Sequence, residues 1–370
     1  MTRRDNCARG LKRKALLQGA QWMVGAPVFR RLLLRRLKRQ LRQSYDEKEK
    51  DPERLRYLKW FGRHLEAFAE RLILERPSAA RAALRFADTW VRDMDRRAAM
   101  RAEGLPTPVT AVIEPTDRCN LKCPGCYAAS SRGGSDMPFE RLVDIVQQIV
   151  DMGVTLITIS GGEPFIRELE DQVISRLAEE FNSHAFLVYT NGTLIDRQAA
   201  RRLGEVGNVF PAISVEGFEH ETDARRGGGI YQRDRCARER LAEHEVMHGF
   251  SATVTRENAE LIAGDEFIEK RIEEGDLFGW FFLLQPIGRS PRPDLMVTAD
   301  QRAMLRESIF RWRAENRPIF LGDFWNDGHL AGGCIAGGAG YFHIYANGDI
   351  SPCVFSPVSV SYTHLTLPTN

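Results

Sequence analysis

The chain has 370 residues, of which 43% are hydrophobic, and this composition excludes a disordered protein and favours two or three domains. The formal net charge of +2 averages two unlike parts, because residues 1–105 hold 27 Lys and Arg against 13 Asp and Glu, whereas the rest holds 25 against 37. The sequence therefore predicts a basic amino-terminal region joined to an acidic body.

Cysteine usage and the lack of a recognisable targeting segment indicate a reducing setting. The seven cysteines are odd in number and are not spaced like a disulfide framework. The basic start, MTRRDNCARGLKRK, is followed by an apolar stretch that Gln, Gly and Pro interrupt and that is too short to span a bilayer. We therefore expect a cytoplasmic protein without a transmembrane segment.

Residues 1–105 are expected to be all-helical. The stretch 28–41 sets an apolar stripe on a strongly cationic helix, and two further helical runs cover 51–74 and 77–102. Such a basic front suits an anionic membrane surface or a docked peptide partner, and the alternative is a helical cap with a solvated cationic face. Nucleic acid is the least favoured partner, because the sequence carries no RNA-recognition signature and few aromatic residues among its arginines.

Strands and helices alternate after Gly104, Pro106 and Pro108 interrupt the helical pattern. The expected strands are near-continuously apolar and cover 111–116, 154–160, 185–190, 208–215, 249–255 and 277–285. The expected helices cover 138–152, 167–181, 196–204, 231–245, 258–274 and 300–317. Six βα units in succession predict an α/β fold with a parallel sheet and outer helices, either an open doubly wound sheet or a barrel.

Three cysteines follow the first expected strand, in the segment from Cys119 through Cys123 and Cys126 to Tyr127. In parallel α/β architectures, functional sites are built at this edge of the sheet. Three thiolates are one fewer than a closed structural zinc site needs. A cubane iron–sulfur cluster that is held by only three cysteines keeps one iron open to an outside ligand. A zinc site that a distant His or Cys completes is the alternative.

Other polar segments end the following strands. Two glycines, Gly161 and Gly162, allow the backbone to approach a ligand closely, and Glu163 offers a carboxylate that suits an ammonium group. We expect the polar groups at this rim to converge on one volume. The segments are Ser160–Pro164, Thr190–Gly192, Ser214–Gly217 and Gln285–Gly288.

The spacing Cys119-x3-Cys123-x2-Cys126, followed by Gly161-Gly162-Glu163-Pro164, resembles the radical S-adenosylmethionine (SAM) superfamily over about residues 109–317. The resemblance implies a partial (β/α)6 barrel and a [4Fe–4S] cluster on the three cysteines, with SAM chelating the open iron. It implies that an electron, supplied by a donor such as a flavodoxin or ferredoxin, cleaves SAM to methionine and a 5′-deoxyadenosyl radical. This radical would abstract a hydrogen atom from the substrate.

The same resemblance implies the residues that contact SAM. Glu163 and the glycine backbone would hold its amino group, Ser214 and Glu216 match the pair that touches its ribose or carboxylate, and Ile287 matches a position near its adenine. Many members carry an aromatic residue just before the third cysteine, whereas here Gly125 occupies that place and Tyr127 follows the cysteine. The expected contacts are Gly161, Gly162, Glu163, Pro164, Tyr127, Asn191, Ser214, Glu216 and Ile287.

A second cysteine pair lies beyond the expected barrel. Cys334 and Cys353 bracket a segment that reads as a hairpin with its turn at Asn347-Gly348. The pattern resembles the start of a SPASM or twitch domain, which implies an auxiliary iron–sulfur cluster on these cysteines. The alternative is a small hairpin with two buried cysteines.

The carboxyl-terminal residues suggest that the sequence is a fragment. Residues 360–369 resemble the translation of a sequencing adapter, so we expect the natural protein to continue past about Pro357 with further cysteines. The expected regions are a basic helical region 1–105, a radical SAM core 106–317, a truncated SPASM or twitch-like segment 318–357, and adapter read-through at 358–370.

Two functional hypotheses follow. The first is a radical SAM oxidoreductase or maturase that acts on a peptide or protein, with a small-molecule substrate as the next choice. The second is a non-catalytic iron–sulfur scaffold whose basic front binds a membrane or nucleic acid. The sequence identifies no proton-transfer residue, although Asp323 and Asp327 are candidates by their position between the barrel and the hairpin.

Overall fold

The computed structural model describes residues 52–105, 107–129, 134–329, 333–356 and 358–359, together with positions 20, 23, 24, 30, 31, 34 and 35. Most of the expected cationic helix at 28–41 and most of 358–370 lie outside these residues.

One sheet forms the centre of the described part of the chain. Its strand order is β7-β6-β5-β4-β3-β2-β1-β8-β9, and neighbouring strands from β1 to β7 are parallel. The strands are β1 Thr110–Ile113, β2 Leu156–Ile159, β3 Ala185–Thr190, β4 Val209–Val215, β5 Gly249–Val254, β6 Phe278–Leu283, β7 Phe320–Asp323, β8 His343–Ile344 and β9 Ile350–Ser351. The predicted α/β fold with a parallel sheet is confirmed.

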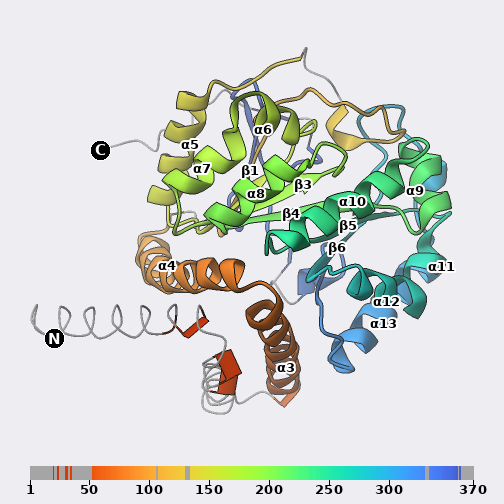
Figure 1. Cartoon of the computed structure of the whole chain (residues 1–370), viewed down its shortest axis with the longest axis horizontal. Helices are drawn as coiled ribbons and strands as arrows, with labels where there is room; N and C mark the ends of the chain where they lie inside the picture. Colours follow the sequence, from red (N-terminus) through yellow and green to blue (C-terminus); the bar gives the residue numbers. More distant parts are fainter. Residues whose placement is uncertain are drawn as a thin grey trace, which may run out of the picture.

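Helices cover the outer face of the sheet, and Figure 1 shows α5 to α8 and α10 packed along it. Their apolar faces form the main core; in α5, for example, Leu142, Ile145, Val146 and Ile149 are buried. The helices are α5 Phe139–Asp151, α6 Phe165–Asp171, α7 Val173–Glu180, α8 Arg197–Val206, α9 Glu219–Arg226, α10 Ile230–Glu243, α11 Ala259–Ile262, α12 Asp265–Glu273 and α13 Ala299–Ala314.

The structure differs from the predicted elements at four places. The helix expected over 167–181 is divided into α6 and α7 because Gln172 adopts a left-handed conformation with φ 57°. The helix expected over 258–274 is divided at Gly264, which is extended. Helix α9 and strand β7 were not predicted, and β7 continues the parallel sheet beyond β6.

Two amino-terminal helices, α3 (Pro52–Glu75) and α4 (Pro77–Ala102), lie across the amino ends of the strands. Arg71 donates to the carbonyl oxygens of Asp276 at 2.6 Å and Pro318 at 3.2 Å, just before β6 and β7. Arg85 donates to the carbonyl oxygens of Asn182 and Val206, just before β3 and β4. This part of the basic region therefore caps the amino end of the sheet.

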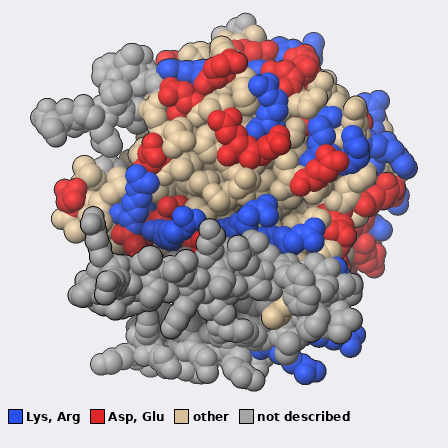
Figure 2. All heavy atoms as spheres, turned by 60° about the vertical axis from the view of Figure 1, so that its left-hand side comes forward, with Lys and Arg blue, Asp and Glu red and all other residues tan. Residues whose placement is uncertain are grey.

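Side chains of both charge signs lie on the surface of the described body. Figure 2 shows Lys and Arg side chains interspersed with Asp and Glu over one face of the described body. No helix within the described residues is both long enough and apolar enough to cross a membrane.

The carboxyl-terminal hairpin adds to the opposite edge of the sheet from β7. Strand β8 pairs antiparallel with β9 and parallel with β1, so that Val112 lies beside His343. The hairpin predicted from the turn at Asn347-Gly348 is present, and it is joined directly to the strand that precedes the three cysteines.

Candidate functional site

A cavity of ≈ 310 Å³ lies between the carboxyl ends of the parallel strands and the carboxyl-terminal segment. Its size is within the range of small-molecule binding sites. The residues that line its rim come from the segments after β1, β2 and β3, from the end of β4 and from α9. They are Cys119, Cys123, Cys126, Tyr127, Gly161, Gly162, Glu163, Asn191, Ser214, Arg225 and Arg226.

The three cysteines of the predicted cluster motif all line this cavity. Cys119 is exposed, Cys123 and Cys126 are half-buried, and all three are free thiols. No group of three or more His, Cys, Asp or Glu side chains in the described part of the chain is arranged to hold one metal ion. A [4Fe–4S] cluster instead needs three thiolates on three separate irons, and three thiols that open on one cavity fit this donor set.

The segment after β2 packs tightly against the segment that leads to Cys119. The amide of Gly162 donates to the carbonyl oxygen of Thr116 at 2.9 Å, and the amide of Glu163 donates to that of Arg118 at 2.8 Å. A Cβ at Gly162 would collide with the Arg118 carbonyl, and one at Gly161 (φ +107°) would lie 2.6 Å from the Thr116 carbonyl oxygen. The two glycines are therefore required by this backbone contact, not only by approach to a ligand.

Glu163 is the carboxylate of the rim and is 1% exposed. Its Oε1 accepts from the Thr190 hydroxyl at 2.6 Å and the Phe165 amide at 3.1 Å, and its Oε2 accepts from the Asn191 amide at 2.7 Å. Burial raises the pKa of Glu163 above its ordinary value, although these hydrogen bonds oppose the rise. The carboxylate is held in one orientation and retains lone pairs for a cationic ligand.

Tyr127 and Asn191 connect the cysteine segment to neighbouring strands. The Tyr127 hydroxyl lies 2.8 Å from the Ser160 hydroxyl, and burial raises the pKa of this phenol. The side-chain amide of Asn191 donates to Asn120 at 2.8 Å. Both contacts hold the loop that carries the cysteines in place.

Two arginines of the rim were missed by sequence reasoning. Glu216, predicted to touch the cofactor, is buried and accepts from Arg226 Nε at 2.8 Å, while Arg225 lies 2.7 Å from the same Oε1 atom. Both guanidinium groups line the cavity, as does Ser214, whereas Glu216 is not among the lining residues. The Arg-Arg pair at the end of α9 is the signal in the sequence that marks them.

Electrostatic effects around Arg226 connect it with the cluster motif. Burial opposes the charge of Arg226, but the neighbouring Glu216 carboxylate and the Cys123 thiol raise its pKa. Burial also raises the pKa of the Cys123 thiol, and Arg226 counteracts this rise. Positive charge is thus fixed beside the second cysteine.

The segment after β6 lies against the cysteine loop. The Arg289 amide donates to the Cys126 carbonyl oxygen at 3.0 Å, and the Gly125 amide donates to the Arg289 carbonyl oxygen at 3.0 Å. Gln285 lines the cavity, but Ile287 does not. Pro164 also lies outside the lining residues. The cofactor contacts expected at Ile287 and Pro164 therefore stay predictions.

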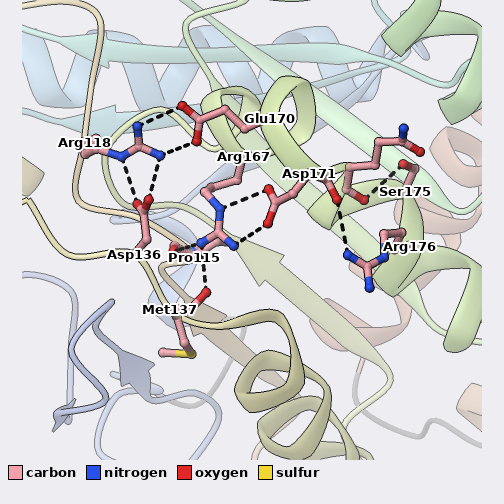
Figure 3. A network of polar contacts seen from close by, with 10 residues as sticks. Pro115, Arg118, Asp136, Met137, Arg167, Glu170, Asp171, Ser175 and Arg176 are labelled. Carbon is pink, nitrogen blue, oxygen red and sulfur yellow. Dashed lines mark hydrogen bonds and ion pairs between the residues drawn. The ribbon is translucent and has the colours of Figure 1, made fainter.

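A polar network fixes the backbone before the cysteine loop, at 115–118, and after it, at 136–137 (Figure 3). Arg118 contacts Asp136 and Glu170, so that the residue before the first cysteine is tied to α6. Arg167 donates to the carbonyl oxygens of Pro115 at 3.1 Å and Met137 at 2.8 Å. The helix that follows the Gly-Gly-Glu-Pro segment therefore positions the loop that carries the cysteines.

The second cysteine pair lies in the carboxyl-terminal segment. The Tyr341 hydroxyl is 2.8 Å from Cys353 Sγ, and Cys334 is exposed. Tyr341 lines the cavity, so this segment covers it, but the auxiliary cluster on Cys334 and Cys353 stays a prediction.

Asp323 and Asp327, the candidates for proton transfer, stabilise the turn after β7. Asp323 Oδ1 accepts from the Asn326 amide at 3.0 Å, and its Oδ2 accepts from the Asn326 side chain at 2.7 Å. Asp327 pairs with Arg313. Neither aspartate lines the cavity.

Comparison with known proteins gives a consistent result. Residues 113–245 match the sequence model of the Radical SAM superfamily. The chain is 31% identical over 150 residues to Fe-coproporphyrin III synthase of Methanosarcina barkeri, covering 39% of this chain and 36% of that protein. It is 28% identical over 281 residues to mycofactocin maturase MftC of Mycolicibacterium smegmatis, covering 72% and 70%. It is 25% identical over 263 residues to the sporulation killing factor maturation protein SkfB of Bacillus subtilis, covering 66% and 60%.

The chain thus spans about a third of the first of these relatives and three fifths of SkfB. Two solved structures share its fold. The structure of Streptococcus suis SuiB bound to S-adenosylmethionine has a TM-score of 0.60 at 20% identity, covering 73% of this chain and 67% of that one. The structure of anSMEcpe with bound AdoMet has a TM-score of 0.54 at 20% identity, covering 68% and 76%.

Proposed function

Because this chain belongs to the radical SAM superfamily, we propose that it reductively cleaves SAM and abstracts hydrogen from a peptide or protein substrate. The observation that carries the proposal is the meeting of three thiols, the fixed Glu163 carboxylate and two guanidinium groups on one cavity. These groups are the donors and charges that a cluster and a zwitterionic amino acid moiety require.

The residues that would hold the cluster are Cys119, Cys123 and Cys126. When bound, a [4Fe–4S] cluster supplies SAM with the electron that produces methionine and a 5′-deoxyadenosyl radical, and a flavodoxin or ferredoxin type of donor would reduce it in a cytoplasmic setting. The chain's own contribution is to hold the loop. Arg118, Tyr127 and the packing at Gly162 fix its backbone, so that the thiols are positioned before the cluster assembles.

The charged groups of the rim suit the two ends of the methionine moiety of SAM. Glu163 would accept a hydrogen bond from the ammonium group, since both of its oxygens are already oriented by Thr190, Phe165 and Asn191. Arg225 and Arg226 would donate to the carboxylate, and Glu216 holds them in place from behind.

A peptide or protein substrate is supported by the relatives. MftC is named a maturase and SkfB a maturation protein, and structures of SuiB and anSMEcpe are described with bound peptides. The carboxyl-terminal segment of this chain also covers the cavity, as a substrate-binding element would. We further propose that Cys334 and Cys353 contribute ligands to an auxiliary iron–sulfur cluster.

Anaerobic reconstitution with iron and sulfide tests the function. The loaded protein, incubated with SAM and dithionite, is expected to release 5′-deoxyadenosine. The Cys123→Ala variant should lose this activity, while Cys236→Ala, which removes a thiol on α10 away from the cavity, should retain it. A protein that carries a cluster but releases no 5′-deoxyadenosine would instead support a non-catalytic scaffold.

A further inference from the structure

Side chains on the inner face of the sheet form the apolar part of the same cavity. It is lined by every other residue of the strands, among them Leu156, Leu187, Tyr189, Trp280 and Phe282. We call these five residues, together with Phe324 after β7, the inner chamber. The intervening residues point outward into the main core, as Ile157, Val188 and Phe281 do.

Aromatic rings give the inner chamber a preformed wall. The Phe282 ring is 5.6 Å from Tyr189, 5.2 Å from Phe324 and 6.5 Å from Trp280, measured between ring centroids. The Trp280 indole lies over Gly322, where a Cβ would come within 2.5 Å of the ring. The Trp280 ring can occupy this position only because residue 322 of β7 is a glycine.

The chamber packs against the helical cap. Leu156, Leu187, Tyr189 and Trp280 pack in one cluster with Phe86 of the helical cap. We therefore expect a ligand to enter from the carboxyl ends of the strands, where the cysteines line the cavity.

Charge is confined to the rim. Among the described residues that line the cavity, the charged side chains are Glu163, Arg225 and Arg226, and each follows the carboxyl end of a strand. The polar residues deeper in the cavity are neutral hydroxyls, such as Thr158 and Ser251. A charged substrate group in the inner chamber would lose its hydration without gaining a counter-ion.

One hydroxyl in the chamber is open to a ligand. Tyr127 contacts Ser160 and Tyr341 contacts Cys353, whereas within the described residues we find no hydrogen bond for the Tyr189 hydroxyl. Burial raises the pKa of Tyr189 well above its ordinary value, so the phenol stays protonated. It can therefore donate one hydrogen bond to a ligand.

We propose that the inner chamber takes an uncharged, apolar side chain of the peptide substrate, aliphatic or aromatic, and that Tyr189 donates a hydrogen bond to the peptide beside it. This inference rests on the proposed function, because it names the substrate class of the same site. It also separates the two kinds of relatives: a porphyrin with several carboxylates, such as coproporphyrin III, would place negative charge in a chamber that holds no described cation.

Binding of matched peptides tests the proposal. Acetyl-Ala-Xaa-Ala-amide peptides with Leu, Phe, Asp or Lys at the central position are titrated by calorimetry into the anaerobic, cluster-loaded, SAM-bound protein. We expect the Leu and Phe peptides to bind roughly 10- to 100-fold more tightly than the Asp and Lys peptides. Equal or tighter binding of the charged peptides or of coproporphyrin III would overturn the inference, and so would undetectable binding of the Leu and Phe peptides at millimolar concentration.

Two variants locate the binding in the chamber. Tyr189→Phe removes only the phenolic hydroxyl. It should weaken binding of the Leu peptide about 3- to 10-fold without changing the iron content of the protein. Trp280→Leu should reduce the preference for Leu and Phe over Asp, whereas Phe310→Leu on α13, which does not line the cavity, should leave it unchanged. Unchanged peptide affinity and selectivity in both chamber variants would contradict the assignment.

The same preparation separates this inference from the proposed function. Release of 5′-deoxyadenosine with dithionite and no peptide reports on SAM cleavage alone. If no 5′-deoxyadenosine is released, the proposed function is rejected, regardless of the peptide affinities. Its presence together with no preference among the peptides would reject only the substrate class.

Discussion

The guanidinium of Arg118 holds the Glu170 carboxylate through two hydrogen bonds, at 2.9 and 2.5 Å, one residue before Cys119 (Figure 3). Asp136 lies 2.6 Å from the same group. An exposed ion pair usually contributes little to folding stability. Here its geometry is bidentate, and it ties the backbone of a proposed cluster ligand to α6, so its effect should appear in cluster binding more than in stability.

Arg118→Ala should therefore weaken cluster retention roughly tenfold, as loss of a group that orients a metal ligand commonly does. Iron content during anaerobic dialysis against a chelator measures this effect. The control is Arg141→Ala, which alters a pair with Asp144 on the exposed face of α5. If both variants lose iron at the rate of the wild type, the network does not position the cysteine loop.

The contact between the two motif segments gives a second prediction. A Cβ at Gly162 would collide with the carbonyl of Arg118, so Gly162→Ala must push the segments apart at a cost of about 1–3 kcal/mol. We expect reduced iron uptake and a lower free energy of unfolding in urea. Gly228→Ala is the matched control, because nothing lies within 4 Å of its added methyl group. Normal iron uptake by the Gly162 variant would show that the contact tolerates a side chain.

Sequence patterns predicted strands β1 to β6, but they predicted neither helix α9 nor strand β7. The apolar run 185–190 coincides with β3, because a strand buried on both faces reads as continuous hydrophobic sequence. Helix α9 (EHETDARR) has a single buried residue, Thr222, so no apolar stripe reveals it. Strand β7 has only four residues, and its parallel pairing with β6 joins segments that lie far apart in the sequence.

The candidate site was predictable only where a short motif carries it. The three cysteines and Glu163 follow from spacing and strand context, and they line one cavity. Arg225 and Arg226 reach that cavity because Glu216 holds them, a contact between an unpredicted helix and a strand end that no local pattern encodes. The inner chamber was not predicted either, although inward-facing hydroxyl residues such as Thr158 and Ser251 alternate with apolar outward-facing residues such as Ile157.

Arg226 provides a test of the proposed SAM contact. Arg226→Gln removes a charged donor from the cavity, while Arg225 still pairs with Glu216. We expect the affinity of the cluster-loaded protein for SAM to fall roughly 10- to 100-fold, the effect of losing a hydrogen bond to a charged group. Calorimetric titration with SAM measures this, with Arg233→Gln on the exposed face of α10 as the control. Equal affinity in both variants would place the SAM carboxylate elsewhere.

A buried aspartate behind the rim predicts how stability depends on pH. Asp234 of α10 is fully buried, its Oδ1 lies 3.1 Å from the position that a Cβ of Gly192 would occupy, and neither oxygen has a hydrogen-bond partner within the described residues. Burial raises its pKa from 3.8 to about 7, although Arg238 and Arg226 oppose the rise. The folded chain therefore binds this proton more tightly than the unfolded chain does.

The sign of the effect follows from this difference. A carboxyl group whose pKa is raised on folding stabilises the folded state fully below the unfolded pKa of 3.8, and this contribution is lost as the pH rises through about 7. Between pH 5 and 8 the free energy of unfolding of the wild type should fall by about 2–3 kcal/mol relative to that of Asp234→Asn, whose side chain stays neutral. Urea unfolding of both proteins under anaerobic conditions at these two pH values measures the difference. As a control, Asp95→Asn on the exposed face of α4 should show the same pH dependence of stability as the wild type. If the stabilities of the wild type and of Asp234→Asn change equally between the two pH values, the Asp234 carboxylate is already ionised at pH 5 through contact with the neighbouring arginines.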